Sequence, residues 1–225
     1  MVRQLGFLAV CVLGLSSIAR AADLTIESVE LAAPEALAAE VAKTLAPGSF
    51  KVTDGKKVVC EVWLAAKWPA KAGFKATEEV LYPFEVGELI GAIRFPRKTT
   101  DFRNQEIAAG VYTLRYGQQP VDGNHVGTSP TRDFLLLSPA AEDKDPARLD
   151  KDKLFKTSKD AAKSTHPAIM TVLPVPADAD LDATPTLVHE EAKEMWSALI
   201  KGNEVAGDKT SPRVLNLVIV GHGGE

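Results

Sequence analysis

Alternating apolar and polar residues recur along most of the chain and predict short β-strands. In the run 110–117, every second residue is large and apolar, and these residues are Tyr112, Leu114 and Tyr116. The run 134–137 reads Phe-Leu-Leu-Leu, which is long enough for a buried strand. Gly110 and the Gly-, Asp- and Asn-containing segment between the two runs supply turn residues. We therefore expect two neighbouring strands at the centre of a sheet.

Further strands are predicted on both sides of this pair. Residues 24–31 alternate with one slip in phase, as in an edge strand, and Asp54-Gly55 joins 50–52 to 57–64 in a hairpin. Residues 186–201 show strand-like alternation but also a helix-forming composition, and we favour a hairpin there. The other predicted strands are 86–95, 168–173 and a nearly continuous apolar run at 214–220.

Helical patterns are few. Residues 34–45 place Leu37, Val41 and Leu45 at intervals of four, which predicts a short N-terminal helix. Residues 144–164 are rich in Lys, Asp and Ala and predict a helical insertion on the surface. Seven to nine strands with so little helix indicate a mainly β fold, a single β-sandwich of the immunoglobulin or prealbumin kind. An α+β domain is the alternative if 186–201 is helical.

The first 21 residues have the pattern of a secretory signal peptide. Arg3 is followed by an uncharged apolar stretch at 5–15, and Ala19-Arg20-Ala21 offers small residues for cleavage. We expect residues 22–225 to form one exported domain, periplasmic or extracellular. No later segment reaches the roughly 20 apolar residues of a membrane-spanning helix, so no integral membrane segment is expected after cleavage.

The net charge limits the possible partners, and the cysteine content limits the possible disulfides. Removal of Arg3 and Arg20 would move the formal charge from −4 to −6. An acidic chain is a poor partner for nucleic acid, which requires a basic surface. Cleavage would also remove Cys11 and leave Cys60 as the single cysteine, so no intrachain disulfide is expected. Its apolar neighbours predict a buried, inert Cys60.

No common catalytic motif is present in the sequence. It contains no Gly-x-Ser-x-Gly elbow, no His-Glu-x-x-His, no phosphate-binding glycine loop and no Cys-x-x-Cys. We therefore predict no resident cofactor and favour a protein that is not an enzyme.

The loop between the two central strands holds the main candidate for chemistry. Asp122, Asn124 and His125 offer oxygen and imidazole ligands, and glycines on both sides would let the backbone turn them inward. If His189 and His222 lay close by, a divalent metal site of His125, Asp122, His189 and His222 would form. The structural alternative is a turn in which Asp and Asn bond to the backbone.

Two further groups of residues are candidates for binding. Arg115 and Asp133 are candidate binding residues, although a structural ion pair between them is the favoured interpretation. Aromatic side chains offer a platform for a sugar or, more commonly in a sandwich, part of the core. These residues are Trp63, Tyr112, Tyr116 and Trp196.

Several segments of the middle third together resemble an uncharacterised family of secreted bacterial proteins, of the kind found in planctomycetes and acidobacteria. They are Gln-Glu-Ile at 105–107, Gly-Val-Tyr-Thr-Leu-Arg-Tyr-Gly at 110–117, Asp-Gly-Asn-His at 122–125 and Ser-Pro-Thr-Arg-Asp-Phe-Leu-Leu at 129–136. The resemblance implies a bacterial exported protein and carries no activity with it. The Gly-x-Tyr-x-Leu run is also common in prealbumin-like sandwiches.

The functional expectation is an exported, non-catalytic protein that binds an unidentified ligand or envelope partner, or has a structural role in the envelope. A metal-binding protein or metal-dependent enzyme centred on His125 is one alternative. A carbohydrate-binding module that uses exposed aromatic side chains is the other.

Overall fold

The computed structural model describes residues 23–122, 129 and 131–223 and shows a mainly β protein. The expected signal peptide at 1–21 lies outside these residues. The helices are α1 (Ala39–Ala42) and α2 (Lys151–Ala162), with 3-10 turns at Leu181–Ala183 and Glu191–Lys193. The strands are β1 (Leu24–Val29), β2 (Ser49–Asp54), β3 (Lys57–Leu64), β4 (Trp68–Pro69), β5 (Leu89–Phe95), β6 (Thr99–Thr100), β7 (Glu106–Ile107), β8 (Gly110–Gln118), β9 (Asp133–Pro139), β10 (Ile169–Leu173), β11 (Thr186–Glu190), β12 (Met195–Ala206) and β13 (Lys209–Val220).

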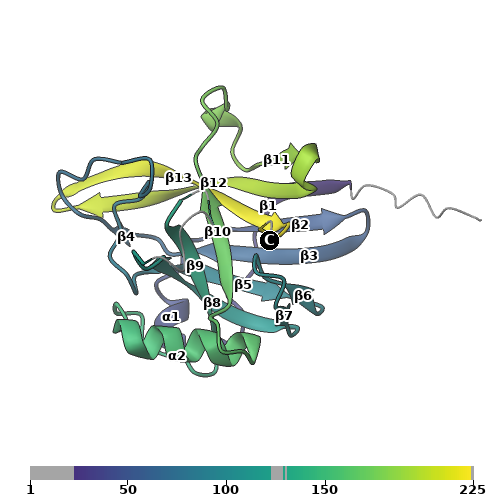
Figure 1. Cartoon of the computed structure of the whole chain (residues 1–225), viewed down its shortest axis with the longest axis horizontal. Helices are drawn as coiled ribbons and strands as arrows, with labels where there is room; N and C mark the ends of the chain where they lie inside the picture. The colour runs from purple at the N-terminus through teal and green to yellow at the C-terminus, as the bar shows by residue number, and fades with distance from the viewer. Residues whose placement is uncertain (1–22, 123–128, 130, 224–225) are drawn as a thin grey trace, which may run out of the picture.

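Eleven of the strands form one sheet that curls into a half-barrel (Figure 1). Its order is β1-β2-β3-β5-β8-β9-β10-β13-β12-β11, and β4 pairs in parallel with β12. The end strands β1 and β11 are not paired, yet some of their Cα atoms lie within 8 Å of each other. The expectation of a β-sandwich is not confirmed, because β10 pairs with both β9 and β13 and so joins what would be two sheets.

The predicted strand pairs are present. β8 and β9 are antiparallel neighbours in the middle of the sheet, and β2 and β3 form the hairpin around Asp54 and Gly55. Gly55 has φ 57°, which a glycine adopts without steric cost. Residues 186–201 form the paired strands β11 and β12, so the hairpin interpretation is confirmed and the helical alternative is wrong.

Three elements differ from the sequence prediction. The helix expected over 34–45 is regular only across the four residues of α1. β12 and β13 form a long hairpin that reaches beyond the rest of the sheet, and β13 starts five residues before the predicted 214 (Figure 1). Tyr82 and Phe84 lie outside the strands, in a segment for which no element was predicted, but both are buried in the core.

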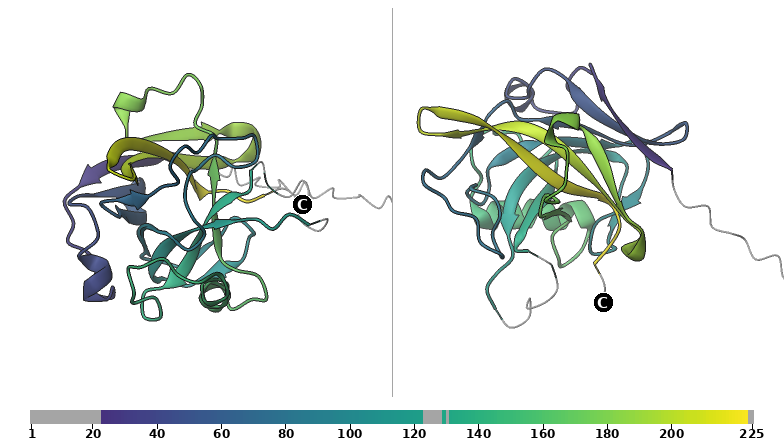
Figure 2. Two further views of the ribbon diagram at one scale, coloured as in Figure 1. Left: turned by 90° about the vertical axis from the view of Figure 1, so that its left-hand side faces the viewer. Right: turned by 90° about the horizontal axis from the view of Figure 1, so that it is seen from above.

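Helix α2 lies within the predicted insertion at 144–164. The Asp150 side chain caps its first turn by accepting from the backbone N–H groups of Asp152 and Lys153. Leu154 is fully buried against Leu136 of β9 and its neighbours. Figures 1 and 2 show α2 on the side of the sheet opposite the β12–β13 hairpin, where it covers the outer face of the central strands.

The concave side of the sheet is packed with large side chains. Trp68, Phe84 and Tyr116 are fully buried there, and their rings meet edge to face. Cys60 belongs to the same cluster, and burial raises the pKa of its thiol to about 12. The prediction of a buried cysteine is therefore confirmed, and the raised pKa disfavours the reactive thiolate.

Candidate functional site

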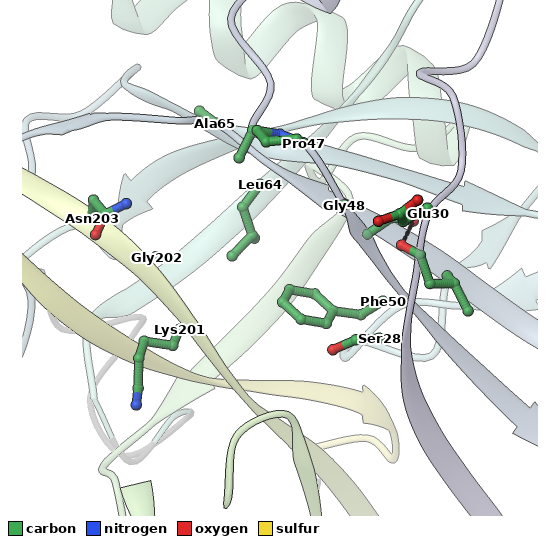
Figure 3. A pocket seen from close by; sticks show the side chains of 13 residues that line it. Ser28, Glu30, Pro47, Gly48, Phe50, Leu64, Ala65, Lys201, Gly202 and Asn203 are labelled. Carbon is green, nitrogen blue, oxygen red and sulfur yellow. Dashed lines mark hydrogen bonds between the residues drawn. The ribbon is translucent and has the colours of Figure 1, made fainter. Parts of the chain in front are cut away.

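A cavity of about 440 Å³ opens between the N-terminal strands and β12 (Figure 3). Four segments that are distant in the sequence meet there, namely 28–30, 46–50, 64–65 and 201–203. The volume falls within the range of about 300 to 1,000 Å³ that is typical of small-molecule sites.

The floor of the cavity is apolar. Phe50 of β2 and Leu64 of β3 point into the space between these strands and β12 (Figure 3). Both side chains continue into the main core, where Leu64 is buried and Phe50 is half-buried. The Ser28 hydroxyl lies near Phe50 in the same view. A ligand on this floor would therefore extend the hydrophobic core toward solvent.

The rim is held by the turn that leads into β2. Gly48 has φ 90°, a conformation that other residues adopt at a cost, and it precedes the strand directly. The Ser49 hydroxyl donates to the Val29 carbonyl at 3.0 Å, and the Ala46 N–H donates to the Leu64 carbonyl at 2.8 Å. These bonds tie the rim to β1 and β3, so the opening is formed before a ligand arrives.

The facing wall is formed by Lys201, Gly202 and Asn203 of β12. A Cβ atom on Gly202 would lie 2.3 Å from the ring of Trp68, so the two groups are in direct contact. Trp68 is itself fixed, since its indole N–H donates to the Ile90 carbonyl at 2.8 Å. The Lys201 ammonium points away from Leu64 and lies 3.9 Å from the Asp182 carboxylate. Its charge is therefore directed toward Asp182 and away from the floor.

The chemistry of the lining favours binding. None of the described residues that line the cavity is a histidine or a cysteine, and Glu30 is the single carboxylate among them. Nucleophilic and acid–base catalysis both require a reactive group with a partner that activates it. The cavity provides a concave surface with an apolar floor and hydrogen-bonding groups at its edge.

The candidate Arg115 is a buried structural residue. Its guanidinium binds Asp143 through two nitrogen atoms at 2.8 Å and also donates to the carbonyls of Gly87, Ala147 and Asp145. Thr113 donates its hydroxyl to the same Asp143 carboxylate. All five N–H donors of Arg115 are used in this way. The predicted Arg115–Asp133 pair is wrong, because Arg115 lies opposite Leu136 in the sheet and meets Asp143 instead.

Asp133 is also fully buried, but it has a different partner. It accepts from the Tyr116 hydroxyl and, at 2.6 Å, from the Leu81 N–H. Burial raises the pKa of the Asp133 carboxyl above its ordinary 3.8, an effect that the Tyr116 and Leu81 hydrogen bonds oppose. Burial and the nearby carboxylate also raise the pKa of Tyr116, so its phenol stays protonated and donates. Neither group reaches solvent, so both serve the fold.

The metal-site hypothesis gains no support from the residues described. Asn124 and His125 lie outside them, and Asp122 is exposed. His189 stacks on Trp196 with ring centroids 4.0 Å apart, and His222 is exposed beyond β13. Across 23–122, 129 and 131–223, no group of three or more His, Cys, Asp or Glu side chains is arranged to hold a metal ion.

The four aromatic residues do not form an exposed platform. Trp63, Tyr112 and Tyr116 are buried, as expected for core residues. The Trp63 indole N–H donates to the Leu31 carbonyl at 3.2 Å, and the Tyr112 hydroxyl donates to the Ala108 carbonyl at 2.9 Å. Trp196 is half-buried beneath His189. A sugar therefore finds no flat stack of rings among these side chains.

No local sequence pattern indicated the cavity or the partner of Arg115. Phe50 and Leu64 belong to an ordinary strand pattern, and Gly202 stands in a segment that was not predicted as a strand. Asp143 is one of several charged residues in a row, and only its burial distinguishes it from its neighbours. A motif search has no means of finding such positions.

The helices and three comparisons with known proteins bear on the wider assignment. Within the described residues, no helix is both long and apolar enough to cross a membrane. No protein-family model, curated protein or solved structure matches this chain.

Proposed function

We propose that this protein is an exported, non-catalytic binding protein that holds a small, largely apolar and uncharged ligand in the cavity beside β12. The observation that carries the proposal is the convergence of four distant segments on one preformed opening with the apolar floor of Phe50 and Leu64. Export follows from the signal-peptide pattern at 1–21 and from the family resemblance.

The ligand class follows from the lining. An anionic group would find no cation aimed at the floor, because the Lys201 ammonium is directed to Asp182. A cationic group would find only Glu30, which is exposed at the edge of the cavity. Apolar area removed from water contributes about 25 cal/mol per Å². Burial of a hydrocarbon or aromatic body on Phe50 and Leu64 is therefore the main source of affinity.

The proposal is tested with N-phenyl-1-naphthylamine, a neutral aromatic amine whose fluorescence rises in apolar surroundings. The folded protein should bind it saturably with a stoichiometry of one. Ser28→Trp places an indole at the cavity wall from an exposed strand position, and it should weaken binding by about tenfold or more. Thermal unfolding of each variant checks that the fold is retained.

Thr25→Trp is the matched control. Thr25 is exposed on the same strand but does not line the cavity, so this variant should bind the dye like the wild type. Equal weakening by both substitutions would contradict the proposal. So would the absence of saturable dye binding to the folded wild type.

A further inference from the structure

A second cavity lies on the outer side of β9 and β10, and a tightly held turn forms part of its wall. The turn connects β6 to β7 and is built around the buried carboxylate of Asp101. One Asp101 oxygen accepts from the backbone N–H groups of Arg103 and Gln105 at 2.9 and 2.8 Å. The other accepts from the Gln105 side chain at 2.8 Å and from the Ile169 N–H at 3.0 Å.

These four bonds fix the position of Arg103. They also occupy the Asp101 carboxylate, which is 3% exposed and does not line the cavity. The Phe102 N–H donates to the Ile169 carbonyl at 3.1 Å, so the turn is docked on β10 by this backbone bond and by the bond from the Ile169 N–H to the Asp101 carboxylate. The Arg103 side chain is exposed and forms no ion pair with any carboxylate of the described chain.

The segment after β13 brings a second polar side chain to the same place. The Gly223 N–H donates to the Phe102 carbonyl at 2.9 Å. Arg103 follows one partner of this bond and His222 precedes the other, and both side chains line the cavity. The β6–β7 turn and the segment after β13, which are far apart in the sequence, are thus held together by a backbone bond.

The cavity has a volume of about 590 Å³ and is lined by both apolar and polar residues. Phe102, Phe134 and Ile169 supply apolar surface. Arg103, Asn104 and His222 supply a guanidinium, an amide and an imidazole, each of which can donate hydrogen bonds. None of the described residues that line the cavity is an aspartate or a glutamate. Arg103 is therefore the one arginine, lysine or carboxylate residue among the described residues of the lining.

We infer that this second cavity binds a small organic anion with an apolar body, such as an aromatic or branched carboxylate. The carboxylate pairs with Arg103, whose planar guanidinium matches two carboxylate oxygens, and accepts further bonds from Asn104 and His222. The apolar body lies on Phe102, Phe134 and Ile169. This site is separate from the cavity beside β12 and shares no lining residue with it.

Benzoate is the probe, titrated into the full mature protein by isothermal calorimetry at low salt, with acetate and inorganic phosphate in parallel. Benzoate should bind with a stoichiometry of one and more tightly than either small anion, because only benzoate has an apolar body. Arg103→Ala should weaken benzoate binding by about tenfold or more, and Arg103→Lys should weaken it less. His222→Ala should give a smaller loss than Arg103→Ala.

Arg97→Ala is the matched control. Arg97 is an exposed arginine on the loop after β5, donates to the Val58 carbonyl at 3.1 Å and does not line the cavity. The inference is overturned if Arg97→Ala and Arg103→Ala weaken benzoate equally, or if the wild type does not bind benzoate. Phosphate binding as tight as benzoate would overturn the apolar part of the ligand class. Arg103→Ala should leave dye binding at the cavity beside β12 unchanged, so the failure of one proposal can be distinguished from the failure of the other.

Discussion

The middle of the sheet and the region beside β12 use buried space in opposite ways. Between β5, β8 and β9, side chains fill both faces, with the main core inside and the clusters around α1 and α2 outside. Strands β1 and β2 pair with each other but not with β12, and a cavity remains between them over Phe50 and Leu64. The first region holds charge in its interior, and the second holds an opening with little charge at its floor.

This difference separates structural polar groups from those available to a ligand. The Arg115–Asp143 pair is charged, yet every donor of Arg115 is bound within the protein. It ties the loop after β9 to β8 and to the start of β5. The cavity beside β12 has few charges, but its surface is free to meet another molecule. The buried Arg115–Asp143 pair is therefore part of the structural scaffold, and the less polar cavity beside β12 is the candidate binding site.

The largest effect is expected from breaking the buried pair. Arg115→Met leaves the Asp143 carboxylate buried without its cation, which should lower the free energy of unfolding by about 3–5 kcal/mol. Urea denaturation followed by circular dichroism measures the change. The double variant Arg115→Met/Asp143→Leu removes both charges and should recover part of the loss. A cost below about 1 kcal/mol for the single variant would show that the pair does not hold this region together.

The packing of α2 should give the next largest effect. Leu154 is fully buried against β9, so Leu154→Ala should cost about 2–5 kcal/mol through lost contacts and the cavity that it leaves. Lys156→Ala on the exposed side of the same helix should change stability by no more than about 0.5 kcal/mol. Similar costs for the two variants, measured by thermal or urea unfolding, would mean that α2 does not seal the outer face.

A smaller cost is expected beside the cavity, where β12 contacts Trp68. The added methyl of Gly202→Ala would collide with a buried ring, and overpacking of this kind typically costs about 1–3 kcal/mol. Gly207→Asn is the comparison, since Gly207 has φ 61° and open space around its Cβ position, and asparagine tolerates that conformation. Equal stability of G202A and wild type would show that Trp68 can move away from β12.

The smallest effect is a change in pH dependence at Asp133. Its folded-state pKa is raised, so the folded protein holds this proton to a higher pH than the unfolded chain does. The contribution of Asp133 to stability therefore falls as pH rises above 3.8. The stability of the wild type relative to Asp133→Asn should decline across that window. Tyr116→Phe removes a hydrogen bond that lowers the pKa, so it should steepen the dependence. Parallel stability curves for the three proteins would contradict this assignment.

The parts of the fold with local signals were predictable from the sequence. Strand alternation at 110–117 and the Asp54-Gly55 turn depend on residues that are close in the chain, and both predictions are confirmed. The curled single sheet depends on β10 pairing with both β9 and β13, and no local pattern encodes which strands become neighbours. The predicted partner of Arg115 was wrong for the same reason. Asp133 stands on the adjacent strand, but the register places it opposite Gln118, and Asp143 arrives from the loop beyond β9.

The cavity could not be predicted from the sequence, because its lining comes from four separated segments and includes Gly202 of β12, which has no side chain. His189 and His222 were prominent in the sequence as metal ligands, yet one stacks on Trp196 and the other stands near Arg103 at the outer cavity. Residue types alone predict a functional site correctly only when the fold brings the distant segments that carry them together. Here the convergence occurs around Phe50 and Leu64, which carry no distinctive motif.

The contrast between the two regions is tested most directly by hydrogen exchange with and without N-phenyl-1-naphthylamine. Amides that take part in opening of the cavity should exchange more slowly when the dye is bound. We predict added protection in β1, β2 and β12 and no change in β8 and β9. Protection confined to β8 and β9, or dye binding with no change in β1, β2 and β12, would contradict the account.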